Sequence, residues 1–282
     1  MDRDDRLDSK ENYGMKLPIT RKLYLLGLGI IFVASYSQYL VRGLGLFLGE
    51  LVVYGIPFFA ASSFLGLVMI KKAFRPKFVA LKFGLAFFGA FTVLGTLAGA
   101  AVFYVIATFD PAAVSLLHRP NPVLHIPPEF AWTMVWNSFI IVGPAEEYLF
   151  RGFVYGGLLS LFKGRHWVSL AFISSVLFAL AHLYYALVYG IASLVQFTDL
   201  IAFGMAMAFT YYLSGGNLLV PALIHGAYDA TGFIGVATST DIGMLLRAVM
   251  ILAGVIASFA LFILKMFGST ESRQENARKL PN

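Results

Sequence analysis

The chain has 282 residues, of which 59% are hydrophobic and only 13% are charged, a composition that excludes an ordinary water-soluble fold. The absence of cysteine excludes disulfides, thiolate zinc sites and a cysteine nucleophile. The net charge of +6 does not indicate nucleic-acid binding, because Lys and Arg cluster beside apolar segments instead of alternating with exposed aromatic residues.

Long apolar runs predict an all-α polytopic membrane protein. Residues 1–21 mix acids and bases, unlike a signal peptide, so we expect an N-terminal tail and a first crossing that is retained. Residues 22–266 are predicted to form one membrane domain, and residues 267–282 a C-terminal tail. A crossing needs ~20 apolar residues, which leaves room for about eight helices. These are placed near 22–41, 46–70, 80–108, 130–158, 167–189, 193–213, 218–237 and 242–264.

Some of these segments have features of their own. The second run begins with several glycines and could be re-entrant, and the sixth is interrupted by Gln196 and Asp199. The loop 109–129 is rich in proline and is predicted to hold one short interfacial helix at 112–117.

The distribution of basic residues predicts the orientation of the helices, because Lys and Arg are retained on the cytoplasmic side during insertion. With eight crossings, seventeen of the 21 Lys and Arg residues fall in the two tails and in the loops after the second and fourth crossings. Arg42 and Arg119 lie on the opposite side, whereas Arg151 and Arg247 lie within crossings. We therefore expect an integral membrane protein with both termini in the cytoplasm.

The fourth crossing carries Gly143-Pro144-Ala145-Glu146-Glu147-Tyr148-Leu149-Phe150-Arg151. Charged side chains inside a bilayer cost several kcal/mol and are functional hypotheses by default. Residues four apart share a helix face, so Arg151 can pair with Glu147, while Glu146 points about 100° away. We expect Glu147 to be structural and Glu146 to face a cavity, where it can act as a general base on water.

Two further crossings carry histidines. Phe178 and His182 are four residues apart on the fifth crossing, and His225 and Asp229 are four apart on the seventh. Taken singly, each group has a structural interpretation: a buried ion pair, or a polar contact between helices. Their functional interpretation depends on all three groups meeting in one place.

These segments resemble the EExxxR, FxxxH and HxxxN/D motifs of the CPBP family, also called the ABI family, which includes the type II CAAX prenyl endopeptidases. The resemblance runs from about Met134 to Phe233. It implies eight transmembrane helices around an intramembrane catalytic cavity. It also implies peptide hydrolysis, with a membrane-anchored protein or peptide as the substrate and a prenylated tail as one candidate.

The resemblance also implies roles for individual residues. Glu146 and His182 would activate the attacking water, and His225 with Asp229 would stabilise the oxyanion, while Glu147, Arg151 and Phe178 would support the site. The last motif position is often Asn, whose amide can donate to an oxyanion. An ionised Asp229 cannot donate, so it could instead orient His225.

Two mechanisms remain open at this point. Glu146, His182 and His225 could hold a divalent metal such as zinc, with water as a fourth ligand. The HExxH signature of soluble zinc proteases is absent. A metal-free pair of Glu146 and His182 is the interpretation that we favour.

Two other functions compete with proteolysis. Intramembrane Glu and His side chains also relay protons in transporters, although no pair of related halves is visible in this sequence. An inactive family member that regulates a membrane partner is the third hypothesis.

The predicted boundaries contain one conflict. At ~1.5 Å per residue, His182 lies about 22 Å and His225 about 10 Å from the predicted inner ends of their helices. Either the helices tilt strongly or the fifth crossing begins later than Trp167, and we expect the latter.

Overall fold

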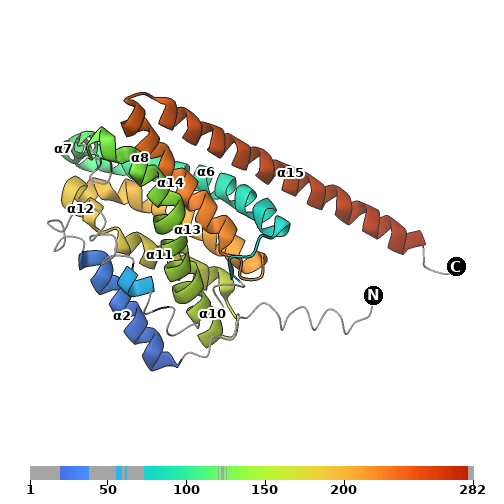
Figure 1. Cartoon of the computed structure of the whole chain (residues 1–282). Coiled ribbons are helices and arrows are strands. Elements are labelled where there is room, and N and C mark those ends of the chain that lie inside the picture. The colour runs from blue at the N-terminus through green and yellow to red at the C-terminus, as the bar shows by residue number, and fades with distance from the viewer. Residues whose placement is uncertain are drawn as a thin grey trace.

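The computed structural model describes residues 20–37, 55–58, 61, 73–119, 121, 124 and 126–278. All regular elements in this part of the chain are helices, which confirms the all-α prediction (Figure 1). The α-helices are α2 (Arg21–Ser37), α6 (Phe78–Phe109), α7 (Pro111–Val114), α8 (Pro128–Asn137), α9 (Gly143–Glu147), α10 (Gly156–Leu161), α11 (Trp167–Ala181), α12 (Tyr184–Tyr189), α13 (Ser193–Leu213), α14 (Leu219–Thr238) and α15 (Ile242–Arg278).

Within the described residues, four helical stretches are long and apolar enough to cross a bilayer. They are Phe78–Phe109, Tyr184–Leu213, Leu219–Thr238 and Ile242–Lys265, and Trp167–Ala181 is a shorter apolar helix. The chain is therefore an all-α membrane protein, whereas the number eight stays a prediction. The predicted second crossing lies outside the described residues, apart from 55–58 and 61.

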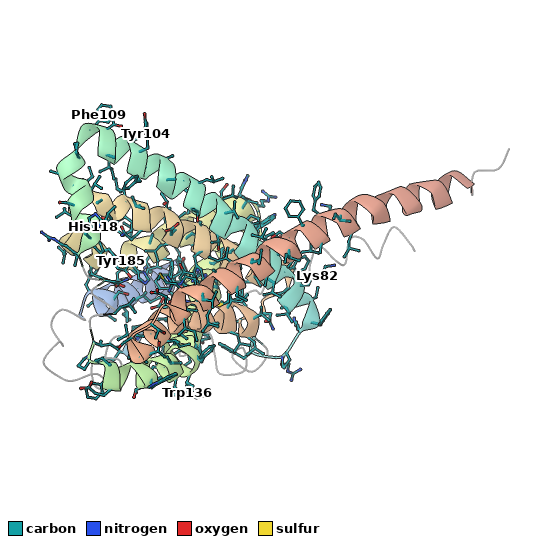
Figure 2. All side chains as sticks on the ribbon, turned by 90° about the horizontal axis from the view of Figure 1, so that it is seen from above. Lys82, Tyr104, Phe109, His118, Trp136 and Tyr185 are labelled. Atoms are coloured by element: carbon teal, nitrogen blue, oxygen red, sulfur yellow. The ribbon has the colours of Figure 1, made fainter. Side chains whose placement is uncertain are left out.

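The outer surface of the bundle is apolar, as lipid contact requires. Figure 2 shows Tyr104, Phe109 and Trp136 pointing away from the helices, and all three side chains are largely exposed. Large amphipathic rings of this kind are typical of the zones where a membrane protein meets lipid and water. The long α15 is the least buried of the four candidate spans, and its C-terminal part extends beyond the other helices (Figure 1).

Several boundaries differ from those predicted. The fifth crossing is two helices, because α11 ends at Ala181 and α12 begins at Tyr184. The sixth is not interrupted, since Gln196 and Asp199 both lie inside α13. The expectation of a later start for the fifth crossing is wrong, because α11 begins at Trp167. The short helix predicted at 112–117 is present, as α7 followed by a 3₁₀ turn at Ser115–His118.

The fourth crossing is one helical path that contains two π-helical stretches. These stretches, Ser138–Val142 and Tyr148–Tyr155, lie on either side of the short α9. Every residue from Tyr148 to Tyr155 is buried, so this path forms part of the core of the bundle. A π turn widens the helix locally and is frequently found at functional sites.

A tight turn makes α13 and α14 neighbours. Gly215 and Gly216 adopt φ values of 68° and 82°, a conformation that side chains other than glycine rarely adopt. The Asn217 amide then donates to the carbonyl of Arg75, and its side-chain oxygen accepts from the N–H of Val220 in the first turn of α14. This side chain satisfies one backbone donor at the start of α14 and ties that start to the segment before α6.

The fourth crossing and α14 approach each other closely at two glycines. A Cβ added at Gly143 would lie 2.5 Å from the carbonyl oxygen of Ala222, and one added at Gly226 would lie 2.6 Å from that of Ser138. Both obstacles are backbone atoms, which cannot rotate away. The two helices therefore meet backbone to backbone in a seam that only glycine permits.

We expect Gly226→Ala to lower the stability of the protein by about 1–3 kcal/mol, because the added methyl group forces the seam apart. Thermal unfolding in detergent measures this change. Gly29→Ala in α2 is the matched control, since a Cβ at that position meets nothing within 4 Å. An equal effect of the two substitutions would show that the seam does not constrain the packing.

Candidate active site

Three separate segments bring the predicted site residues together. Helix α9 carries Glu146 and Glu147, the end of α11 carries Phe178 and is followed by His182, and α14 carries His225 and Asp229. Ion-pair distances join all of these titratable groups into one cluster with Arg151. Sequence spacing alone places the residues on three helices, and the fold makes them neighbours.

Glu146 lies between the two histidines. Its Oε2 atom is 3.9 Å from Nε2 of His182 and 3.7 Å from Nε2 of His225. The side chain of Glu146 is only 9% exposed and that of His182 only 16% exposed, so all three groups meet inside the protein. One carboxylate oxygen is thus directed toward two imidazole nitrogens that come from different helices.

Glu147 faces in another direction and binds two partners through one oxygen. The Nδ1 atom of His225 donates to Oε1 of Glu147 over 2.8 Å, and Nη1 of Arg151 lies 3.0 Å from the same oxygen. An ionised carboxylate only accepts hydrogen bonds, so the proton of this pair is on Nδ1. Glu147 therefore sets the orientation of His225 and directs its Nε2 toward Glu146.

The orientation of His182 is set by the backbone of its own helix. Its Nδ1 atom is 2.9 Å from the carbonyl oxygen of Phe178. Because a carbonyl only accepts, Nδ1 carries a proton, and Nε2 is the ring nitrogen directed toward Glu146. The break between α11 and α12 thus places a basic nitrogen beside the carboxylate.

The Phe178 ring packs against Arg151 and both histidines of the cluster. The guanidinium carbon of Arg151 lies 4.5 Å from the centre of the Phe178 ring, a cation–π contact. The ring centre is also 4.7 Å from that of His182 and 6.0 Å from that of His225. One apolar ring therefore contacts the buried cation and both imidazoles and holds their spacing.

Asp229 lies at the accessible edge of the cluster. Its Oδ2 is 3.5 Å from Nε2 of His225, on the same nitrogen that faces Glu146. Its side chain is 31% exposed, compared with 9% or less for the two glutamates. A molecule that approaches His225 from this side meets Asp229 first.

Comparison with known families agrees with the motifs. Residues 127–231 match the family model described as type II CAAX prenyl endopeptidase Rce1-like, and the matched segment contains every residue of the cluster. The match therefore describes the segment 127–231 as similar to this family. The resemblance drawn from the three motifs is thereby confirmed, and the match supports, at the level of the family, a membrane protease of the CAAX type. No curated protein and no solved structure matches the chain.

The matched segment contains the donor types of a zinc site in Glu146, His182 and His225. Among the described residues, however, no group of three or more His, Asp or Glu side chains is arranged to hold a metal ion. A metal held by these three side chains stays a prediction, and the chemistry below is derived from the side chains alone.

Two aromatic residues outside the motifs also pack against the histidines of the cluster. The Phe203 ring packs 5.0 Å from the ring of His225, and the Tyr185 ring lies parallel to that of His182 at 6.4 Å. No sequence signal distinguishes either ring from the many other aromatic residues of the chain. Arg247, by contrast, had a signal, because it is a charged residue inside an apolar run.

Two histidines outside the motifs lie apart from the cluster. His118 and His166 are exposed, as expected of residues in connecting segments, whereas His125, Arg42 and Glu50 lie outside the described residues. Arg247, which the sequence places within a crossing, binds α14.

Proposed function

We propose that the chain is an intramembrane endopeptidase that hydrolyses a peptide bond with water activated by Glu146 and His182. The observation that carries this proposal is the placement of Glu146 Oε2 at 3.9 Å from His182 Nε2, with Glu146 buried and His182 partly buried. That distance is too long for a direct hydrogen bond. It suits one water molecule that donates one hydrogen to each acceptor at about 2.8 Å.

Water held in this way can be deprotonated as it attacks. Its oxygen bonds to the carbonyl carbon of the scissile peptide, and its proton passes to Glu146, which acts as the general base. Glu146 then returns the proton to the nitrogen of the departing amine as the carbon–nitrogen bond breaks. The products are a carboxylic acid, which keeps the second hydrogen of the water, and an amine. The acid then passes this proton to the amine, which gives a carboxylate and an ammonium group, and both glutamate and histidine regain their starting states.

His225 is suited to stabilise the negative charge that develops on the carbonyl oxygen. Its Nδ1 proton is committed to Glu147, and its ring nitrogens lie within 2.8, 3.5 and 3.7 Å of three carboxylates, a surrounding that an imidazolium cation requires. In that form Nε2 carries the second proton and can donate it to the oxyanion. Asp229, which also faces Nε2, would position this donor.

The substrate class follows from the environment of the site. A cluster buried in a membrane domain favours a peptide or a membrane-anchored protein whose apolar part dissolves in lipid, and the family match makes a prenylated tail one candidate. The orientation with both termini in the cytoplasm would let such a tail enter from the cytoplasmic leaflet.

Purified protein in liposomes should cleave a quenched fluorescent peptide that partitions into the membrane, and His182→Ala should lower turnover by about 10²-fold or more. Prenylated and unmodified versions of the same peptide, assayed side by side, test the substrate class. Equal turnover by the wild type and the His182 variant would reject the assigned mechanism. Transport of a solute without peptide hydrolysis would reject the peptidase itself.

A further inference from the structure

The position of His182 depends on the end of α11, because His182 directly follows its last residue. An α-helix leaves its last carbonyl oxygens without a partner inside the helix. Two of these oxygens bind His182, whose Nδ1 donates to the carbonyl of Phe178 and whose backbone N–H donates to that of Ala179. The N–H of Leu183 donates to the next carbonyl, that of Leu180. His182 thus caps the helix that carries it, so the imidazole ring follows any movement of the helix end.

A second helix also binds this end. The hydroxyl of Tyr36 in α2 donates to the Leu180 carbonyl over 2.7 Å, although the two residues are 144 positions apart. Helix α2 packs against α11 (Figure 1). In the described part of the chain, hydrogen bonds join α11 to other helices at Trp167, Ser174 and Leu180. The bond at Leu180 is the nearest of these to His182.

A second tyrosine joins α2 to the helical path that carries the glutamates. The hydroxyl of Tyr24 donates to the carbonyl of Val154 over 2.7 Å, and its ring stacks on that of Phe153 with the centres 5.5 Å apart. Val154 lies in the π-helical stretch that directly follows α9. Helix α2 is therefore hydrogen-bonded to both segments that approach each other at Glu146 and His182.

We propose that Tyr36 is a positioning residue, which fixes the end of α11 and thereby holds His182 at the distance from Glu146 that the activation of water requires. The Leu180 carbonyl also accepts from the N–H of Leu183, so loss of the hydroxyl leaves no backbone group without a partner. The loss should therefore affect turnover more than stability. The inference rests on the proposed function for its effect on turnover, whereas the environment of the His182 ring can be measured without it.

Tyr36→Phe in the full-length protein removes the hydroxyl and keeps the ring. We expect it to lower kcat about tenfold with KM unchanged, because a displacement of ~1 Å can cost about 10²-fold in rate. Tyr24→Phe is the matched control, since it removes a bond of the same length from the same helix to another backbone carbonyl. It should leave kcat within about twofold of the wild type and lower the thermal midpoint in detergent at least as much, because the Tyr24 bond is buried.

A double-mutant cycle shows whether Tyr36 acts through His182. In the His182→Ala background, Tyr36→Phe should cause no further loss of turnover, because the ring that it positions is absent. An equal loss in both backgrounds would overturn the proposal. So would a Tyr36→Phe variant that does not fold or that unfolds at a lower temperature than Tyr24→Phe, since the bond would then have a structural role.

Nitrogen-15 NMR of histidine-labelled protein in detergent tests the position of the ring without any activity. The imidazole signals of His182 are identified by their loss in His182→Ala. Tyr36→Phe should shift or broaden these signals, and Tyr24→Phe should leave them in place. Unchanged signals in Tyr36→Phe would overturn the positioning role. Shifted signals in a protein that cleaves no peptide would reject the proposed function and retain the connection between α2 and His182.

Discussion

Glu146→Gln is expected to lower the turnover of peptide hydrolysis by about 10²–10⁴-fold while the protein remains folded. Glutamine has nearly the same size and can still accept a hydrogen bond from water, but it cannot take the proton. The carboxylate oxygen that it replaces lies between Nε2 of His182 and Nε2 of His225, where the attacking water is expected to bind. Turnover in liposomes and the thermal midpoint in detergent measure the two parts of this expectation.

Glu129→Gln provides the matched control, because Glu129 is an exposed glutamate in the first turn of α8, on the same helical path. We expect it to change neither turnover nor the thermal midpoint appreciably. If Glu146→Gln kept turnover within a few-fold of that control, another group would have to be the base. If both quantities fell together, Glu146 would have a structural role.

Glu147→Leu is expected to lower stability by about 3–5 kcal/mol, the usual cost of removing one partner from a buried ion pair. Arg151 is 1% exposed, and without Glu147 it would have no other carboxylate at bonding distance among the described residues. Adding Arg151→Met should recover much of this loss, because two apolar side chains of similar volume then replace the pair. Denaturant unfolding in detergent compares the two variants.

The same pair of variants separates the two roles of Glu147. Turnover should remain low in the double variant even where stability returns, because Nδ1 of His225 has lost its acceptor in both. Recovery of turnover together with stability would show that the orientation of His225 does not depend on Glu147. A double variant no more stable than Glu147→Leu would argue against the buried pair as the source of the loss.

The spacing of residues along the sequence correctly predicted those contacts of the site that lie within one helix. The four-residue spacing of Glu147 and Arg151 predicted their pairing, and the same spacing placed His225 and Asp229 within reach of each other. Apolar runs likewise predicted the ranges of α6, α13 and α14 to within a few residues. These features depend on helix geometry alone, which a sequence displays directly.

Contacts between different helices could not be predicted from spacing along the sequence. The hydrogen bond from His225 to Glu147 connects residues 78 positions apart, and nothing in either motif assigns the two to each other. The side chain of Arg247 turns inward because of how α15 is rotated, and its apolar neighbours give no indication of that rotation. Tertiary packing decides both of these contacts. The catalytic role assigned to His225 stays a prediction.

The helix break at His182 could not be predicted from the sequence for a related reason. Residues 167–189 contain neither glycine nor proline, so the run looks like one uninterrupted helix. The conflict between the predicted depths of His182 and His225 arose because residues 167–189 were treated as one helix. The two histidines reach Glu146 from different points along their helices, His182 just past the last residue of α11 and His225 seven residues into α14.

The glycine seam has a consequence for how the protein can move. Because the backbones at Gly143 and Gly226 touch, the two glutamates and His225 belong to one stiff unit whose internal distances change little. His182 stands outside that unit, on a separate helix that ends beside it. We therefore expect an adjustment that admits a bulky chain to widen the gap between Glu146 and His182, which would couple substrate binding to the activation of water.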